Sequence, residues 1–231
     1  MMKNKRSNQL IIFTRYPRSG SSKTRLIPAL GAKKAALLQK AMTELTLKEM
    51  APLMTSGAVN ARIFFHGCTR FEIEDWLGPM WIFEEQSGTD LGYKMARAFD
   101  VSFSISPDSR SILIGTDIHK LGRDIILDAC QYLDLYDLVL GPAVDGGYYL
   151  IGLNEPRPEL FRDIEWGSPL VLEQTLNKAR INNLKVRLLK ELSDIDRQIG
   201  RASCRERVSI SVVGVTFEKN TLTKNPASAS F

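Results

Sequence analysis

The sequence is poor in the residues that build disulfide frameworks and membrane spans. Its 231 residues include three cysteines, Cys68, Cys130 and Cys204, and two histidines. The cysteines show no metal-ligand spacing and form no even set, so we expect a reduced, cytoplasmic protein. No apolar run approaches the roughly 20 residues of a membrane helix. The apolar run that follows the basic N-terminus is too short for a signal peptide, so we expect no membrane partner.

The chain also lacks a basic helix or a basic stripe interleaved with aromatic residues. The net charge is +5, but residues 199–231 carry five cations against two acids. The rest of the chain therefore holds 26 basic and 24 acidic residues, a balance of only +2. This distribution argues against nucleic acid as a partner.

The C-terminal stretch is unlike the rest of the chain. Residues 199–208, Ile-Gly-Arg-Ala-Ser-Cys-Arg-Glu-Arg-Val, are what one reading frame of a common sequencing adapter encodes. We expect residues 199–231 to be a non-native or disordered tail, and residues 1–198 to form one domain. A clean genomic read that encodes the same tail would contradict this expectation.

What remains is an alternation of apolar runs and amphipathic segments. The hydrophobic pattern predicts strands over 8–14, 61–66, 81–83, 111–114, 138–140 and 186–189, and helices over 33–50, 72–77, 121–133 and 168–183, with another helix after Gly92. Pro52 is expected to end the first long helix, and Ser168 with Pro169 to begin the last. The alternation predicts an α/β fold with a mostly parallel central sheet.

The loop after the first strand is the first candidate for chemistry. Between Arg15 and Arg25 it holds cations and no acid, and Gly20, Ser21 and Ser22 can present backbone N–H groups. Lys23 and Arg25 supply the charge that a diphosphate needs. The loop lacks the second glycine of a nucleoside-triphosphatase phosphate loop, and a solvated basic loop is the structural alternative.

Two acids follow two other predicted strands. Asp117 ends a Gly-Thr-Asp segment, where a carboxylate suits Mg²⁺ or Mn²⁺, although it could instead cap the helix near Leu121. Asp145 is followed by Gly146 and Gly147, between apolar runs that also read as a hairpin. The two acids could share one divalent ion that bridges the phosphates of a nucleotide.

The other candidates are weaker. His119 follows Asp117 closely and could bind a metal, but a loop histidine is more often a surface residue. Cys68 and Cys130 suggest a loop residue and a helix-core residue rather than nucleophiles. Tyr148 and Tyr149 alternate along a strand, so one is expected to face the core and the other the cleft.

Taken in order, several motifs resemble one family. They are Phe13-Thr14-Arg15-Tyr16-Pro17 with Gly20 and Lys23-Thr24-Arg25-Leu26, Asp90-Leu91-Gly92 with Met95, Gly115-Thr116-Asp117, Gly141-Pro142-Ala143 with Asp145 to Leu153, Trp166-Gly167-Ser168 and Asp194-Ile195-Asp196. This order resembles small bacterial transferases known as radical-SAM/selenodomain-associated transferase 1, or arsenosugar-biosynthesis glycosyltransferases.

The resemblance implies a GT-A, or nucleotide-diphospho-sugar transferase, three-layer sandwich. It implies metal binding by Asp117 and catalytic or phosphate roles for Lys23 and Arg25, while Asp145 becomes a second metal ligand or an acceptor-side acid. The nucleotide-binding positions that it implies are Arg15, Gly20, Lys23, Thr24, Arg25, Asp90, Gly146, Gly147 and Trp166. The family usually has Cys-Pro after Gly-Thr-Asp, whereas Ile118-His119 stands here.

Three functions follow from these observations. The first is Mg²⁺- or Mn²⁺-dependent transfer of a glycosyl group from a nucleotide-diphosphate sugar to a small-molecule acceptor. The second is nucleotidyl transfer to a small phosphorylated substrate on the same fold. The loop lacks the Gly-x-Gly with Arg that is typical of sugar-phosphate nucleotidyltransferases, which favours the first. The third is a catalytically inactive nucleotide-binding module, against which the joint presence of Lys23, Arg25, Asp117 and Asp145 argues.

Overall fold

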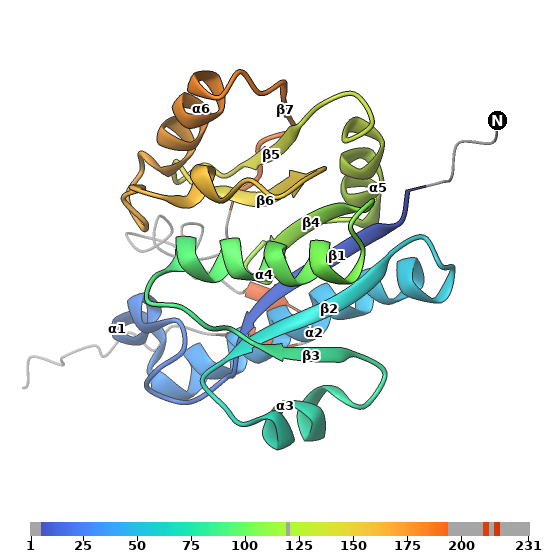
Figure 1. Cartoon of the computed structure of the whole chain (residues 1–231). Coiled ribbons are helices and arrows are strands. Elements are labelled where there is room, and N and C mark those ends of the chain that lie inside the picture. Colours follow the sequence, from blue (N-terminus) through green and yellow to red (C-terminus); the bar gives the residue numbers. More distant parts are fainter. Residues whose placement is uncertain (1–5, 119–120, 194–209, 213–214, 218–231) are drawn as a thin grey trace, which may run out of the picture.

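A seven-stranded mixed sheet forms the centre of the molecule (Figure 1). The computed structural model describes residues 6–118, 121–193, 210–212 and 215–217. The strands are β1 (Asn8–Arg15), β2 (Asn60–His66), β3 (Ile82–Glu85), β4 (Arg110–Gly115), β5 (Leu138–Pro142), β6 (Tyr148–Leu153) and β7 (Val186–Leu188). The helices are η1 (Thr24–Leu26), α1 (Ile27–Leu30), α2 (Ala32–Thr55), α3 (Arg70–Leu77), α4 (Leu91–Ile105), α5 (Arg123–Tyr132), η2 (Pro158–Phe161) and α6 (Val171–Ile181).

The strand order is β3-β2-β1-β4-β6-β5-β7, and only β6 runs against its neighbours. After β1 the chain adds β2 and β3 on one side and then crosses to place β4 on the other side of β1. The order therefore reverses between β1 and β4. Open α/β sheets bind ligands at such a switch point, outside the carboxyl ends of the strands.

Helices cover both faces of the sheet, which makes three layers. Alternate residues of β1 enter two separate cores, so Leu10 and Ile12 pack with α2, α3 and α5, while Ile11 and Phe13 pack with α4 and α6. This period of two is the expected result for a strand buried on both faces. The predicted α/β class with a mostly parallel sheet is confirmed.

Two predicted helix ends were wrong. α2 continues through Pro52 to Thr55, because Pro52 lies in the last turn and the buried side chains of Met50 and Leu53 hold that turn against the sheet. α6 begins at Val171, not Ser168; the Ser168 hydroxyl accepts a hydrogen bond from the Leu170 N–H, before the helix, instead of capping it. In both cases tertiary packing or a local turn overrides the sequence signal.

The last described segments are β8 (Ile210–Val212) and β9 (Val215–Phe217), which form a separate two-stranded antiparallel sheet. The remainder of the predicted tail, including Cys204, and also His119, lies outside the described residues. Within the part of the chain that the structure describes, no helix has the length and apolarity needed to cross a membrane.

Candidate functional site

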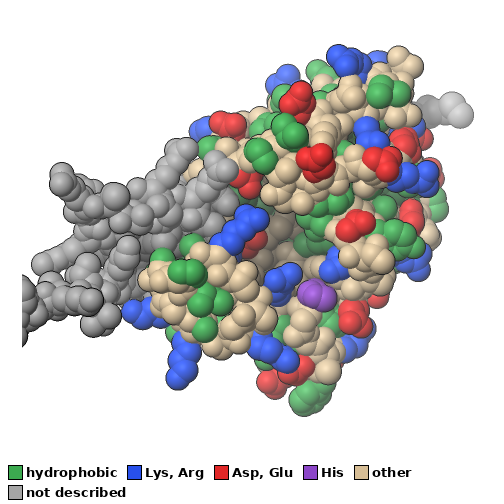
Figure 2. Space-filling view, turned by 90° about the vertical axis from the view of Figure 1, so that its left-hand side faces the viewer, with side chains coloured by type: hydrophobic (Ala, Val, Ile, Leu, Met, Phe, Trp, Pro, Cys, Tyr) green, Lys and Arg blue, Asp and Glu red, His purple; other side chains and the backbone are tan. Residues whose placement is uncertain are grey.

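A pocket of about 600 Å³ opens at the carboxyl ends of the strands. It lies at the switch point between β1 and β4, and its walls come from the loop after β1, the starts of α4 and α6, and the hairpin between β5 and β6. Figure 2 shows this face of the molecule, with a hollow edged by Lys and Arg side chains and a histidine. The place agrees with the general rule for ligand binding in open α/β sheets.

Most of the predicted site residues line this one pocket, although they come from four distant parts of the sequence. Those on its walls are Arg15, Lys23, Thr24, Arg25, Asp117, Asp145, Gly147 and Trp166. Gly20, Asp90 and Gly146 are not on its walls. Their predicted roles in nucleotide binding stay predictions, and the structure shows what each does in the fold.

Lys23 and Asp117 form the central ion pair of the pocket. The Lys23 ammonium donates a hydrogen bond of 2.8 Å to Asp117 Oδ1. The Lys23 side chain is only 3% exposed, whereas that of Asp117 is 59% exposed. Lys23 also adopts a left-handed backbone conformation with φ 50°, which is uncommon for a residue with a side chain. Asp117 does not cap α5, whose N-cap is Gly122.

The loop after β1 is held by its own hydrogen bonds. The buried Ser22 hydroxyl donates to Tyr16 O at 2.8 Å and accepts from the Arg18 N–H at 3.0 Å. The N–H groups of Ser21 and Ser22 both donate to Arg18 O. The prediction that these two N–H groups are presented to a ligand was wrong, because both already donate hydrogen bonds within the loop. The side chains of Lys23 and Arg25 line the pocket, and their predicted role in phosphate binding stays a prediction.

The Asp145 segment is both a hairpin turn and a pocket wall. β5 and β6 pair as neighbouring antiparallel strands, and Asp145 Oδ1 accepts the Gly147 N–H at 3.0 Å inside the turn. Gly146 has φ +87°, and a Cβ atom built there would lie 2.0 Å from Pro169 O. The Gly146 carbonyl accepts the Leu172 N–H, so the turn is docked against the start of α6.

The Asp90-Leu91-Gly92 motif positions Trp166. Asp90 is the N-cap of α4 and accepts the Tyr93 N–H at 2.8 Å. Gly92 leaves room for the indole, since a Cβ atom there would lie 2.5 Å from Trp166 Nε1. Asp90 does not line the pocket itself, but it caps the start of α4, and this start forms part of the pocket wall. The sequence pattern identified this motif as part of the site, but not its structural task.

A buried polar network under the pocket was missed by the sequence reasoning. Thr14, Gln39, Thr43 and Thr116 are nearly inaccessible to solvent, and their side chains hydrogen-bond to one another at 2.9–3.4 Å. Buried polar side chains need such partners. Thr43 and Gln39 lie one helical turn apart on a helix whose pattern was read only for its apolar residues, so their inward direction was not recognised.

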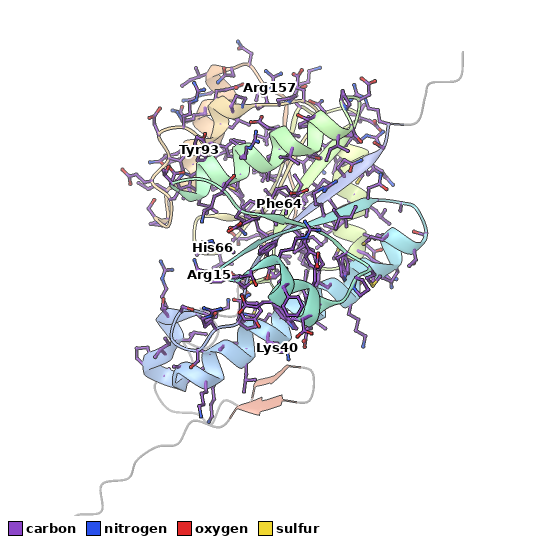
Figure 3. The ribbon with its side chains drawn as sticks, turned by 60° about the horizontal axis from the view of Figure 1, so that its bottom comes forward. Arg15, Lys40, Phe64, His66, Tyr93 and Arg157 are labelled. Carbon is purple, nitrogen blue, oxygen red and sulfur yellow. The ribbon has the colours of Figure 1, made fainter. Side chains whose placement is uncertain are left out.

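Arg15 and His66 end the adjacent strands β1 and β2 and lie side by side (Figure 3). Burial, followed by the charges of Lys94 and Arg15, lowers the pKa of His66. Gln86 donates to the backbone carbonyls of Phe64 and Thr14 at 2.8 and 3.3 Å and so ties the ends of these strands together. This side of the pocket is electropositive.

Tyr148 and Tyr149 pack on opposite faces of β6, as the alternation predicts. Tyr149 lies in the core against Gly141 and donates its hydroxyl to Lys190 O at 2.9 Å. Burial raises the pKa of Tyr149 to about 12, and it raises the pKa of Tyr148 further. Both residues also line the pocket, so the prediction that only one of them faces the cleft was wrong.

Comparison with known proteins agrees with this geometry. Residues 49–168 match a family described as uncharacterized proteins conserved in bacteria, DUF2064. The chain belongs to the DUF2064 family. A protein from Desulfovibrio desulfuricans G20, assigned provisionally as a nucleotide-diphospho-sugar transferase, has a crystal structure that is 33% identical over 83% of each chain, with a TM-score of 0.77. No functionally curated protein matches this DUF2064 chain in sequence.

More distant structures share the fold alone. The inositol-1-phosphate CTP transferase of T. maritima is 15% identical, with a TM-score of 0.52 over 83% of this chain and 90% of its own. The 4-diphosphocytidyl-2C-methyl-D-erythritol synthase of Anaerococcus prevotii DSM 20548 is 9% identical, with a TM-score of 0.51 over 80% and 89%. The DUF2064 chain thus resembles nucleotide-diphospho-sugar transferases and nucleotidyltransferases in fold.

Proposed function

We propose that this DUF2064 protein transfers a glycosyl group from a nucleotide-diphosphate sugar to a small acceptor with the help of a divalent cation. The observation that carries the proposal is the Lys23–Asp117 pair at the switch point, in one pocket with Arg25 and Asp145. It combines the cations needed by a diphosphate with the carboxylates needed by a metal ion.

The carboxylates fit Mg²⁺ or Mn²⁺ that arrives with a substrate. Among the residues that the structure describes, no group of three or more His, Cys, Asp or Glu side chains is placed to hold a metal by itself. Mg²⁺ is usually bound by one or two carboxylates together with waters and substrate phosphates. Asp117, with its exposed carboxylate, is the first ligand proposed, and Asp145 the second. A bound divalent ion would supply positive charge to the leaving diphosphate.

The residues of the chain divide the remaining work. Lys23 and Arg25 neutralise the charge that develops on the departing diphosphate, and Thr24 lies between them on the same wall. Asp145 keeps one oxygen on the Gly147 N–H, which fixes the carboxylate and leaves the other oxygen for the acceptor or the metal. Direct displacement of the diphosphate by the acceptor needs no covalent intermediate.

The finer assignment follows the motifs. The order of motifs from Phe13 to Asp196 supports membership of the radical-SAM/selenodomain-associated, or arsenosugar-biosynthesis, glycosyltransferases. Cleavage at a sugar carbon rather than at an α-phosphate is favoured because the first loop lacks the Gly-x-Gly with Arg of sugar-phosphate nucleotidyltransferases. The distant structural relatives show the fold alone and leave this choice to experiment.

A thermal-shift screen of the full chain with Mn²⁺ tests the proposal. Ligands that bind the folded state raise the melting temperature by mass action. Nucleotide-diphosphate sugars should raise it more than the matching nucleoside triphosphates, and the effect should require Mn²⁺. A larger shift with a triphosphate, followed by release of pyrophosphate, would instead identify a nucleotidyltransferase. No shift with any nucleotide would refute both.

A further inference from the structure

The pocket has two chemically different walls. One wall carries Arg15, Lys23, Arg25, His66 and Asp117 and rests on the buried threonine network. The opposite wall comes from the starts of α4 and α6 and from strands β4 and β6. Its apolar side chains are Leu91, Met95, Leu113, Tyr148, Trp166 and Val171. Among the described lining residues, Asp145 is the one Asp, Glu, Lys, Arg or His side chain beside this apolar wall.

The apolar wall is held firmly. Met95 and Leu113 are buried in the core beneath it, and Tyr148 and Trp166 pack against the same core cluster. The rings of Tyr148 and Trp166 meet edge to face, with centroids 6.5 Å apart. Gly92 admits the indole at the start of α4, and the Trp166 backbone N–H donates to Ile164 O. The indole is therefore fixed in place before any ligand arrives.

We propose that this apolar wall is the acceptor subsite, and that the acceptor is a small uncharged alcohol with an apolar face. The inference rests on the proposed function, because it takes the cationic wall as the diphosphate site. A phosphorylated or carboxylated acceptor would be desolvated beside Asp145, with no described cation on that wall to pair with it, which is costly. An aromatic wall instead favours a flat, apolar surface.

The transfer step follows from this arrangement. The acceptor hydroxyl oxygen attacks the anomeric carbon of the donor and forms the new C–O bond. The bond from that carbon to the diphosphate oxygen breaks, and its electron pair leaves with the nucleoside diphosphate. The hydroxyl proton passes to the Asp145 carboxylate, which later returns it to water. In this arrangement Asp145 takes the acceptor-side role instead of binding the metal, and it serves an uncharged acceptor as the base.

Benzyl alcohol and benzyl phosphate form a matched pair of probes, identical except for the phosphoryl group and its charge. Binding is followed by the indole N–H resonance of Trp166 in the full chain, assigned with Trp166→Phe, while inorganic pyrophosphate occupies the cationic wall. Benzyl alcohol should move this resonance, and benzyl phosphate should bind at least about tenfold more weakly. The indole resonances of Trp76 and Trp81, which do not line the pocket, should not move.

A charge placed on the apolar wall should reverse the preference. Leu91→Lys adds a cation at a pocket-lining position that is 45% exposed. It should strengthen binding of benzyl phosphate by about tenfold or more. Tyr93→Lys, two residues along α4 at a side chain that is 61% exposed and not on the pocket wall, is the control and should leave both probes unchanged.

The outcomes separate this inference from the proposed function. Equal or tighter binding of benzyl phosphate at Trp166 in the unaltered protein overturns the uncharged acceptor, even if nucleotide sugars bind. No response of Trp166 to either probe overturns the subsite. Selective binding of benzyl alcohol in a protein that binds no nucleotide sugar supports the apolar subsite but refutes glycosyl transfer.

Discussion

At the scale of single residues, Lys23 and Asp117 have competing tasks. In the structure the Lys23 ammonium occupies one carboxylate oxygen of the proposed metal ligand. A divalent ion bound to Asp117 would therefore be repelled by the neighbouring positive charge of the Lys23 ammonium. A diphosphate would relieve this conflict, because it offers both cations an anionic partner. Metal and nucleotide should therefore bind more tightly together than either does alone.

Lys23→Met should separate these effects, because methionine keeps most of the length of the side chain and removes its charge. Without nucleotide, the variant should bind Mn²⁺ about five- to tenfold more tightly, which corresponds to about 1 kcal/mol of relieved repulsion at a partly exposed carboxylate. With Mn²⁺ present, nucleoside-diphosphate binding should weaken by about 2 kcal/mol.

Calorimetric titration of both ligands checks these opposite signs. Lys33→Met, at an exposed position that does not line the pocket, is the matched control and should change neither affinity. If Lys23→Met weakens binding of Mn²⁺ and nucleotide alike, Lys23 supports the shape of the site rather than balancing its charge.

His66 gives the electropositive wall a pH dependence. Its pKa is lowered by burial, by Lys94 and by Arg15, so the unfolded chain binds the proton more readily than the folded one. The stability from neutral His66 is complete above its unfolded pKa near 6.5 and is lost as the pH falls towards its lower folded pKa. Urea unfolding between pH 7 and pH 5 should show a shallower loss of stability in His66→Asn. Parallel curves would remove His66 from this account.

At the scale of elements, two glycines with nearly equal φ angles have different surroundings. Gly20 has φ +88° and open space where a Cβ atom would stand, whereas Gly146 has φ +87° and a Cβ atom there would meet Pro169 O at 2.0 Å. In both alanine variants the left-handed backbone conformation lowers the free energy of unfolding. Only in Gly146→Ala must the hairpin turn also move away from the start of α6. The pair isolates the steric contribution of turn docking.

Gly20→Ala should lower the free energy of unfolding by about 1 kcal/mol, the usual cost of a left-handed residue with a side chain. Gly146→Ala should lower it by at least about 2 kcal/mol more, because backbone must move. Urea denaturation with matched m-values measures both. Equal losses would mean that the turn and α6 separate without cost.

The limits of sequence-based prediction also lie at this scale. The alternation of strands and helices, the hairpin of β5 and β6 and the three acid or cation segments followed from local pattern, because each is written in consecutive residues. Local pattern could not predict three other features. These are the hydrogen bonds of the Ser21 and Ser22 N–H groups within the loop, the contact of the Trp166 indole with Gly92, and the buried threonine network. Each depends on which segments meet in space, and pattern gives periodicity without partners.

Helix ends were missed for the same reason. Pro52 normally ends a helix because it lacks an N–H donor and clashes with the preceding turn. Here the turn is the last one of α2, and Leu53 is 4% exposed in the core. The burial of Leu53 in the core therefore outweighed the tendency of Pro52 to end the helix. At α6 a local turn, rather than burial, moved the start from Ser168 to Val171, next to the hydrogen bond from the Leu172 N–H to Gly146 O.

At the scale of the whole molecule, the strand order explains why these residues form one site. The reversal between β1 and β4 leaves a crevice that no connecting helix fills, and Lys23 and Asp117 enter it from either side. The antiparallel β6 then brings the Asp145 turn to the same edge. The cations of the pocket come from the end of β1 and from the loop after β1, and the aromatic rings of its apolar wall come from β6 and from the segment before α6.

The central claim is that Asp117 couples a divalent ion to a nucleotide diphosphate in this pocket. Calorimetric titration of a nucleotide-diphosphate sugar with and without Mn²⁺ tests it most directly, in the unaltered protein, in Asp117→Asn and in Asp128→Asn, an exposed control on α5. Mn²⁺ should strengthen binding at least about tenfold in the unaltered protein and in the control, and not at all in Asp117→Asn, which should still unfold in one cooperative transition. Equal Mn²⁺ dependence in all three proteins would contradict the claim.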